Sequence, residues 1–385
     1  MTTNSRREFL FAGAAAALYP QAPKKVRVAI IGAGHRSWAH IHVLRQAVAD
    51  VEIVAIADPT PENLDRAVTL AGSHPATYSD YKKMLTEQKD LDAVLVAAPN
   101  FLHAEAAIAA LDRGLNVLSE KPMATSVEDA NRMTEAARRA GKILQIGQQM
   151  RYTPLYEKMA AVVKAGAIGP VEFVSGNLFR GDWNPASWRY PNPRTGVATN
   201  WRFLTHTAGS SLLEDGIHEL DVIHWLVGGR VARVYATGGN NVLKQRETID
   251  HAGILIEYEN GAKVDFGFCL FAPNAGPEAR AMFLIGSQGT IQQAGGKATL
   301  RKKGSREATS IEAADTTPAA VGSRPAGIDE DNGTYREWVA FVSSVRTGKQ
   351  PIASGQVGKE AIKISLLAEK SIRERRIIDW NELPA

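Results

Sequence analysis

The sequence has little that would support disulfides, cysteine-bound metal or nucleic-acid binding. It has one cysteine in 385 residues, Cys269, which cannot form an internal disulfide or a cysteine metal cage. Cys269 lies in the apolar, strand-like segment VDFGFCL, so we expect it in a hydrophobic core. The net charge is only +4, from 45 basic and 41 acidic residues, and no basic stripe is interleaved with aromatic residues. We therefore expect no nucleic-acid partner.

The N-terminus lacks an apolar run long enough to span a bilayer. Arg6 and Arg7 are followed by a short apolar stretch that ends near Tyr19. This pattern resembles a twin-arginine signal, which exports folded proteins. We expect residues 1–23 to be this signal, the mature protein to be periplasmic or secreted, and no membrane anchor. The alternative is a disordered tail on a cytoplasmic protein.

The length exceeds what one hydrophobic core usually supports, which predicts two domains. We place a nucleotide-binding domain at residues 24–147 and a second domain at residues 148–385. In the first domain, apolar strand-like runs such as VEIVAIAD and LDAVLVAAP alternate with helical patterns. This alternation over about 120 residues predicts a parallel, doubly wound sheet, a Rossmann fold.

A glycine motif follows the first strand. Gly32 and Gly34 are the first two glycines of the pattern Gly-x-Gly-x-x-Gly, and Ser37 replaces the third. Gly32 permits a tight turn, Gly34 lets the backbone approach a pyrophosphate at a helix N-terminus, and Ser37 is small enough for close packing. The two residues before Ser37 are His35 and Arg36, and we expect the whole turn to contact a dinucleotide.

Asp58 ends the next strand, 26 residues after Gly32. An acid at this place suits the ribose diol of NAD and repels the extra phosphate of NADP, so we expect NAD and consider NADP less favoured. The alternative is a turn or cap residue. Ligands of such sheets lie at the carboxyl ends of the strands. We therefore expect one crevice to be lined by the residues at those ends, namely residues 32–37, Asp58, Pro99, Asn100, His103, Glu120 and Lys121.

The segment LLEDGIHELD, residues 212–221, contains four carboxylates and one histidine. If it is helical, Glu214 lies four residues before His218 on the same face, and Asp215 and Asp221 lie three residues to either side of it. The alternative is a solvated, charge-rich helix start.

Three segments together resemble the glucose-fructose oxidoreductase / inositol dehydrogenase / MocA-like family, written Gfo/Idh/MocA. They are the Gly-x-Gly turn, APNFLHAEAAIAALDRGLNVLSEKPMATSVEDA and GSSLLEDGIHELDVIHWLVGG. The resemblance implies an N-terminal Rossmann domain, followed by an α/β domain with a large open, mostly antiparallel sheet that often forms a homo-oligomer interface. Several strand-like segments with turn signals such as Asn260-Gly261 fit such a sheet.

The resemblance also implies an NAD(P)-dependent oxidoreductase acting on a secondary hydroxyl of a sugar, cyclitol or glycoside. Lys121 matches the family lysine beside the nicotinamide ribose and the reacting hydroxyl. His218 matches the family histidine assigned as general base, a task that suits imidazole because it titrates near neutrality. The family dehydrogenases carry an aspartate four residues before this histidine. Here the residue is Glu214, which we expect to orient His218 or to contact a substrate hydroxyl.

Other residues are weaker candidates. His103 matches a family segment that edges the nicotinamide, although it could be a helix-start histidine. For the substrate we expect Arg151, with a structural ion pair as the alternative, and also Tyr152, Trp201, Arg202, Asp215 and His218. Two histidines lack ligand spacing with an open acid cluster, so we predict no metal; they are His206 and His224.

Two other functions compete with a dehydrogenase. An NAD-dependent glycosidase would act by transient oxidation and elimination, but such relatives carry Tyr-Pro-Thr-His where this chain has Glu-Asp-Gly-Ile-His. A non-catalytic sugar- or nucleotide-sensing protein on the same fold is disfavoured because Lys121 and His218 are both present.

Overall fold

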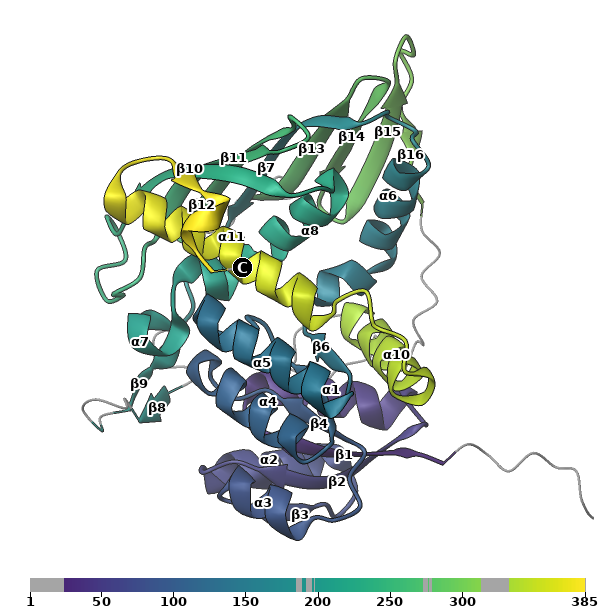
Figure 1. The fold of residues 1–385 in the computed structure, drawn as a ribbon, viewed down its shortest axis with the longest axis vertical. Helices are drawn as coiled ribbons and strands as arrows, with labels where there is room; N and C mark the ends of the chain where they lie inside the picture. Colours follow the sequence, from purple (N-terminus) through teal and green to yellow (C-terminus); the bar gives the residue numbers. More distant parts are fainter. Residues whose placement is uncertain are drawn as a thin grey trace, which may run out of the picture.

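The computed structural model describes residues 24–184, 189–191, 196, 198–272, 276, 279–312 and 332–384. The predicted signal, residues 1–23, lies outside the described residues. The chain forms two sheet-containing layers, with α11 (Gly355–Glu374) running between them (Figure 1). No helix in the described ranges is both long and apolar enough to cross a membrane.

The first sheet has six parallel strands in the order β3-β2-β1-β4-β5-β6. Its central strands are almost entirely buried, as expected for a parallel sheet covered on both faces. The predicted doubly wound sheet is therefore confirmed, with the short β3 as a strand that the sequence did not predict. The strands are β1 (Val26–Ile31), β2 (Val51–Ala57), β3 (Ala76–Tyr78), β4 (Ala93–Val96), β5 (Asn116–Ser119) and β6 (Leu144–Ile146).

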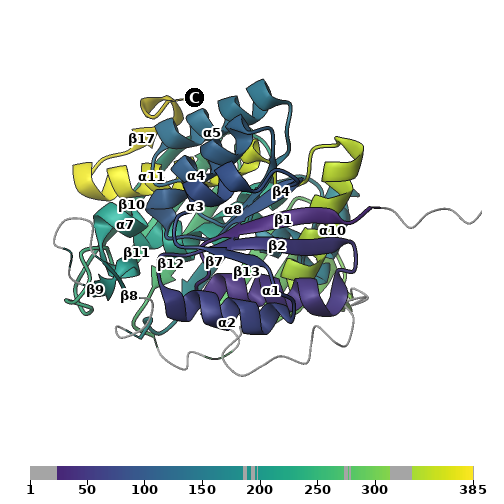
Figure 2. The ribbon, with the colours of Figure 1, turned by 90° about the horizontal axis from the view of Figure 1, so that it is seen from below.

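Helices cover both faces of this sheet (Figure 2). One face packs against α1 (His35–Ala47), α2 (Pro61–Ala71) and α10 (Asn332–Thr347). The other packs against α3 (Tyr81–Glu87), α4 (His103–Asp112), α5 (Val127–Ala140) and part of α11. The side chains of Trp338, Phe341 and Val342 join the core of the first sheet, so α10 returns from the far end of the chain to complete the first domain.

The second sheet has nine strands in the order β16-β15-β14-β13-β7-β12-β11-β10-β17. Only β7 and β12 pair in parallel, and every other pairing is antiparallel. The predicted open, mostly antiparallel sheet is confirmed. Its strands are β7 (Val171–Phe179), β10 (Val231–Gly239), β11 (His251–Tyr258), β12 (Lys263–Cys269), β13 (Arg280–Gly286), β14 (Gly289–Ala294), β15 (Lys297–Lys302), β16 (Thr309–Ser310) and β17 (Ile378–Asp379).

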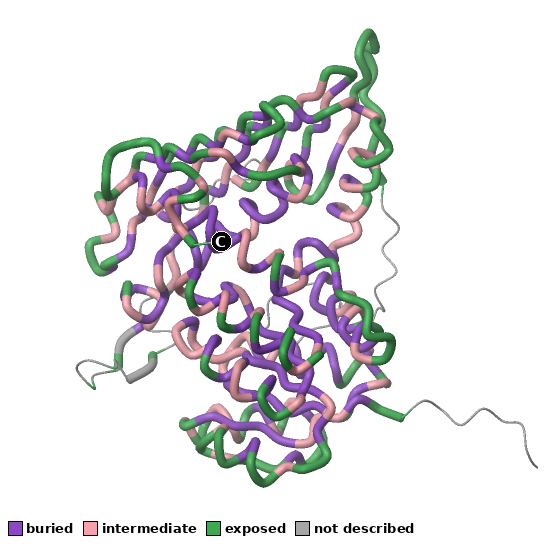
Figure 3. The backbone as a smooth tube through the Cα atoms, in the orientation of Figure 1, coloured by how far each residue is buried: buried purple, intermediate pink, exposed green. Residues whose placement is uncertain are grey.

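Helices cover only one of the two faces of the second sheet among the described residues. The inner face packs against α6 (Pro154–Lys164), α8 (Ile217–Val227) and α11, and buried residues alternate with exposed ones along the strands (Figure 3). Cys269 is only half-buried, in register with His251 and Phe179 on the outer face, so the expectation of a core position is wrong. The outer face is rich in exposed apolar side chains, namely Phe173, Phe179, Tyr235, Leu255 and Phe283.

Several short elements lie between β7 and α8 in the chain. A small hairpin pairs β8 (Arg189–Pro191) with β9 (Ala198–Asn200), and α7 (Thr205–Ala208) follows it. Residues 212–216 then form a π-helical turn that leads directly into α8. This turn lies between the two sheets, because Leu213 and Ile217 pack in the first core and Leu212 and Leu220 in the second.

Candidate active site

The turn between β1 and α1 has the two glycines that a pyrophosphate site requires. Gly32 has a φ of +88°, and a Cβ there would lie 2.7 Å from the backbone of Ala97, so only glycine fits. A Cβ on Gly34 would have no atom within 4 Å, so the protein leaves open space beside this residue. The Ser37 hydroxyl donates to the Gly32 carbonyl and closes the turn from within. The turn therefore offers backbone N–H groups and free volume at the start of α1, as a dinucleotide phosphate needs.

Asp58 lies beside this turn at the end of β2. Its carboxylate accepts hydrogen bonds from the Ala33 amide at 2.7 Å and from the Thr60 amide at 2.9 Å. Asp58 thus performs the turn role that was the alternative in the sequence. Since each carboxylate oxygen can accept more than one hydrogen bond, this role is compatible with a ribose diol. The residues present fit NAD.

Glu120 is the buried centre of the cofactor side. Its Oε1 accepts from Arg36 Nε at 2.6 Å and its Oε2 accepts from the Lys121 amide at 3.0 Å. Although burial opposes ionisation, Arg36 and His40 hold the pKa of Glu120 well below its usual range. The Arg36 guanidinium also donates to the side chains of Gln149 and Thr334. Glu120 and Arg36 therefore hold each other's side chains in place. His35, the first residue of α1, lies beside Trp38.

Lys121 points across to the second domain. Its Nζ donates to the main-chain carbonyl of Glu214 at 2.5 Å and lies 3.6 Å from the Glu214 carboxylate. Glu214 also accepts from Arg202 Nε at 2.6 Å and from the Asn100 side chain at 2.9 Å. Burial disfavours the charged carboxylate, but Lys121 and Arg202 hold the pKa of Glu214 at about 2. Glu214 is therefore an ionised bridge between Lys121 and Arg202.

His218 lies in the first turn of α8, close to this cluster. Its Nδ1 has no hydrogen-bond partner among the described residues, so Glu214 does not orient the imidazole through this atom. Glu214 instead contacts Lys121, Arg202 and Asn100, from a π-helical turn that leads into α8. That Glu214 orients His218 or contacts a substrate hydroxyl stays a prediction. Burial, with the charges of Lys121 and Arg280, keeps the pKa of His218 well below its usual value. The imidazole is therefore neutral near pH 7 and able to accept a proton.

Asp215 has partners that the sequence did not reveal. Its Oδ1 accepts from Arg180 at 2.8 Å and from the indole of Trp183 at 3.0 Å. The Arg180 guanidinium lies 3.6 Å from the centre of the Trp183 ring. Asp215 Oδ2 is buried without a hydrogen-bond partner in the described part of the chain, which leaves an acceptor for a hydroxyl donor. Arg180 is thirty-five residues from Asp215 in sequence, and no local pattern marks it.

The other predicted substrate residues fall into two groups. Trp201 and Arg202 lie at the site, and the Arg202 guanidinium is 4.6 Å from the Trp201 ring. Arg151 instead forms a buried two-bond ion pair with Asp221, at 2.8 Å for each bond, which was its alternative role. The Tyr152 hydroxyl is buried and accepts from the Ala353 amide at 3.4 Å.

His103 is buried and contacts main-chain carbonyls through both ring nitrogens. It is 1 % exposed, and its ring nitrogens lie 2.7 Å and 2.8 Å from the carbonyls of Pro122 and Ala98. Pro99 precedes the short helical turn that carries Asn100 towards Glu214. His103 therefore ties the end of β4 to the Glu-Lys-Pro segment.

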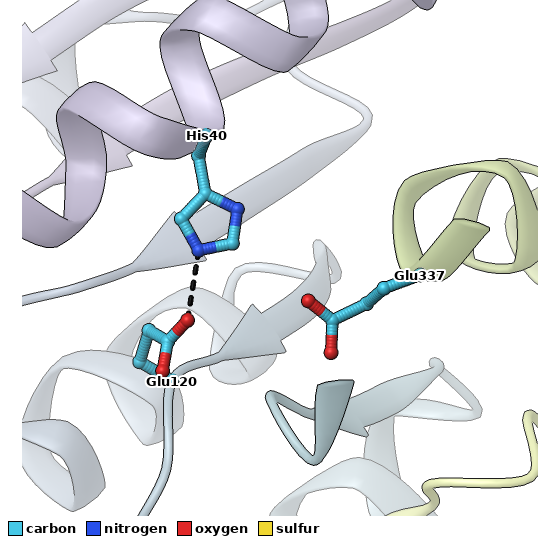
Figure 4. A group of neighbouring side chains, drawn as sticks. All are labelled: His40, Glu120 and Glu337. Carbon is cyan, nitrogen blue, oxygen red and sulfur yellow. Dashed lines mark hydrogen bonds and ion pairs between the residues drawn. The ribbon is translucent and has the colours of Figure 1, made fainter. Parts of the chain in front are cut away.

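One group of three potential metal ligands occurs among the described residues. His40, Glu120 and Glu337 place one ligand atom each within 4.8 Å of one another (Figure 4). His40 Nδ1 accepts from the Trp338 indole at 2.9 Å, and His40 Nε2 lies 2.8 Å from Glu120 Oε1. With Nδ1 occupied as an acceptor, the ring proton is on Nε2, so neither nitrogen offers a lone pair to a metal. Both nitrogens of His40 are used in hydrogen bonds. The absence of a metal remains a prediction.

Fold and site together define a two-domain nicotinamide-dependent oxidoreductase. Two family models match the chain, one of an oxidoreductase family with an NAD-binding Rossmann fold at residues 26–148, and one of the GFO/IDH/MocA C-terminal domain at residues 156–292. The protein belongs to the GFO/IDH/MocA oxidoreductase family.

Relatives and solved structures agree with this assignment. The chain is 30 % identical to inositol 2-dehydrogenase 3 of Saccharopolyspora erythraea over 69 % of its own length and 72 % of the relative. It is 26 % identical to the scyllo-inositol 2-dehydrogenase (NAD(+)) of Bacillus subtilis, over 69 % and 73 %. A levoglucosan dehydrogenase solved with NADH and levoglucosan has the same fold, with a TM-score of 0.78 and 22 % identity over 94 % of this chain and all of the other.

Proposed function

We propose that the protein oxidises a secondary hydroxyl of a cyclitol or sugar and transfers the hydride to NAD. The observation that carries this proposal is the meeting of Lys121 with Glu214, beside a neutral His218 and at the carboxyl ends of the Rossmann strands. Two of the relatives are named as inositol dehydrogenases, which supports a cyclitol as the first substrate class to test.

The chain's own residues have separable tasks in this reaction. NAD, when bound, supplies the hydride acceptor. Lys121 would hold the reacting oxygen with its ammonium group, because a fixed cation stabilises negative charge that develops there. His218 would take the hydroxyl proton, since its depressed pKa keeps the imidazole neutral. Asp215 Oδ2 would accept from a neighbouring hydroxyl of the polyol, and the Trp183 indole would pack on its ring, which the Trp183–Asp215 hydrogen bond and the unpartnered Oδ2 support.

The preference for NAD over NADP is part of the proposal. Asp58 ends β2 as a carboxylate that already holds the glycine turn. A second negative charge, such as the 2′-phosphate of NADP, would be repelled there.

The first experiment is to purify the protein without added nucleotide, denature it and identify what is released. The released nucleotide, or NAD added back, is then tested with inositols and aldoses for growth of the reduced-nicotinamide absorbance band. NAD binding with substrate-dependent reduction is the expected result. A protein that binds neither NAD nor NADP would contradict the proposal, and one that binds sugar and NAD without turnover would favour a sensor.

We also propose export and self-association. Export rests on the twin-arginine pattern at residues 1–23, and cell fractionation with N-terminal sequencing of the mature protein tests it.

Self-association rests on the exposed apolar residues of the outer sheet face, of which Leu255 is 52 % exposed. Leu255→Asp should convert an oligomer to a smaller species in light scattering, and a wild-type monomer would contradict the idea.

A further inference from the structure

Helix α10 contributes a buried indole to the first domain. The Trp338 indole N–H donates to His40 Nδ1 at 2.9 Å, although the two residues are 298 positions apart. Both side chains are fully buried, and their rings meet edge to face. Because Nδ1 is an acceptor, His40 is held as the neutral tautomer with its proton on Nε2.

The His40 proton is directed at Glu120. His40 Nε2 donates to Glu120 Oε1 at 2.8 Å, and Arg36 Nε donates to the same oxygen at 2.6 Å. The other oxygen, Oε2, accepts from the Lys121 amide at 3.0 Å. Gly147 allows this arrangement, because a Cβ there would lie 3.0 Å from Glu120 Oε2. The carboxylate is thus held on one side by α1 and holds the backbone of Lys121 on the other.

We propose that His40 and Trp338 are positioning residues for Lys121, acting through Glu120. The hydrogen-bond chain runs from Trp338 to His40, then to Glu120 and the Lys121 amide. It fixes the backbone of the residue whose Nζ must reach Glu214 and the reacting oxygen. The inference rests on the proposed role of Lys121, but the chain of hydrogen bonds can be tested without substrate.

A metal ion at this cluster would need a different donor set. It would have to displace the Trp338 indole from Nδ1 or the proton from Nε2, and the second change would leave an imidazolate beside two carboxylates, Glu120 and Glu337. The observed tautomer therefore favours a hydrogen-bond chain over a cation site.

The pH dependence of kcat distinguishes a positioning role of His40 from a role in packing alone. Charged and titratable groups surround Glu120. They are Arg36 and His40 on α1, Lys121 beside it in the chain, Glu337 on α10, His103 on α4 and His218 on α8. Removing the His40 donor raises the pKa of Glu120, so Glu120 is protonated at higher pH than in the wild type. The neutral carboxyl is a weaker acceptor for the Lys121 amide than the carboxylate. An acid limb of kcat should consequently move to higher pH.

Four variants test the proposal. His40→Leu removes both hydrogen bonds, His40→Gln keeps an N–H donor for Glu120, and Trp338→Phe removes only the indole donor. Phe341→Leu is the matched control, since Phe341 is buried in the same helix and packs edge to face on Trp338 without a polar group. We expect kcat to fall by about 10- to 100-fold in His40→Leu, because small displacements of a catalytic group have effects of this size. Trp338→Phe should lose less, His40→Gln should recover part of the rate, and KM should change little.

Hydrogen exchange of the Lys121 amide provides the readout that needs no turnover. Exchange without substrate should be faster in His40→Leu and Trp338→Phe than in the wild type or in Phe341→Leu. Equal exchange in all five proteins would overturn the proposal, as would a stoichiometric metal ion bound in a His40-dependent way. If exchange changes as expected but the wild type reduces no NAD with any polyol, the proposed function fails while the hydrogen-bond chain stands.

Discussion

Lys121 Nζ lies 2.5 Å from the main-chain carbonyl of Glu214, so the catalytic candidate of the first domain is bonded to the second. Glu214 in turn bonds Arg202 and Asn100, and its carboxyl remains ionised because Lys121 and Arg202 hold its pKa at about 2 despite burial. The position of the lysine therefore depends on Glu214, which we expected to orient His218 or to contact a substrate hydroxyl.

Glu214→Gln removes the charge but keeps the size of the side chain. We expect kcat to fall by about 10- to 100-fold, because Lys121 and Arg202 lose their common anion and the lysine is less well placed. NAD affinity should change little. Steady-state kinetics and NAD titration measure both effects.

Glu135→Gln is the control for that change. Glu135 forms an exposed ion pair with Arg138 on α5, and such pairs contribute little. Its kinetics should match the wild type. Full activity in Glu214→Gln would show that the Glu214 bridge is not needed for catalysis.

The pKa of His218 predicts the pH profile of the enzyme. A folded-state pKa lowered by burial, Lys121 and Arg280 means that the imidazole loses its proton below the usual range and stays neutral above it. The acid limb that reports the base should therefore lie well below pH 6.5, the unperturbed value of histidine. His218→Gln should remove this limb and lower kcat by about 10²- to 10⁴-fold. An acid limb at or above the ordinary histidine value would contradict the assignment.

The sequence predicted the parts of the fold that depend on local pattern. Strand–helix alternation predicted the first sheet, and the family resemblance implied the second. The residue spacing of Gly32, Gly34 and Asp58 predicted the nucleotide turn. It could not predict the π-helical turn at residues 212–216, because the broader helix depends on how Leu212 and Leu213 pack into two different cores. The contacts of Glu214 with Lys121 and Arg202 were not predicted either.

Two long-range contacts also could not be predicted from the sequence. Arg180 reaches Asp215 from the end of β7, and Trp338 reaches His40 from a helix that was expected in the other domain. Both contacts depend on tertiary packing, of α10 against α1 in the first domain and of the π-helical turn against the end of β7 in the second. Neither residue has a spacing or motif that marks it.

The two glycines of the turn should respond differently to alanine. Gly32→Ala should destabilise the fold by roughly 1–3 kcal/mol or more, because its φ is +88° and a Cβ would meet the Ala97 backbone at 2.7 Å. Gly34→Ala should unfold at the wild-type temperature, since no atom lies within 4 Å of its Cβ position, but should bind NAD weakly.

Thermal unfolding and NAD titration of both variants test this contrast. If Gly34→Ala binds NAD normally, the open space beside Gly34 is not where the pyrophosphate approaches.

Asp58→Asn tests the cofactor preference. The amide keeps one acceptor for the Ala33 or Thr60 N–H but removes the negative charge at the end of β2. We expect kcat/KM for NAD to fall and that for NADP to rise, changing their ratio by at least about tenfold, since one charge contact of this kind is worth about 1.4 kcal/mol or more. An unchanged ratio, with normal folding, would assign Asp58 to the turn alone.

The most direct test of the central claim compares the wild type with Lys121→Met in one assay. Each protein is mixed with NAD and a series of inositols and aldoses, and reduced nicotinamide is followed by absorbance, with NAD affinity measured in parallel. The account predicts substrate-dependent reduction by the wild type, and an NAD-binding Lys121→Met variant with turnover reduced by about 10²-fold or more. Equal turnover by the two proteins, or none by a wild type that binds NAD, would contradict it.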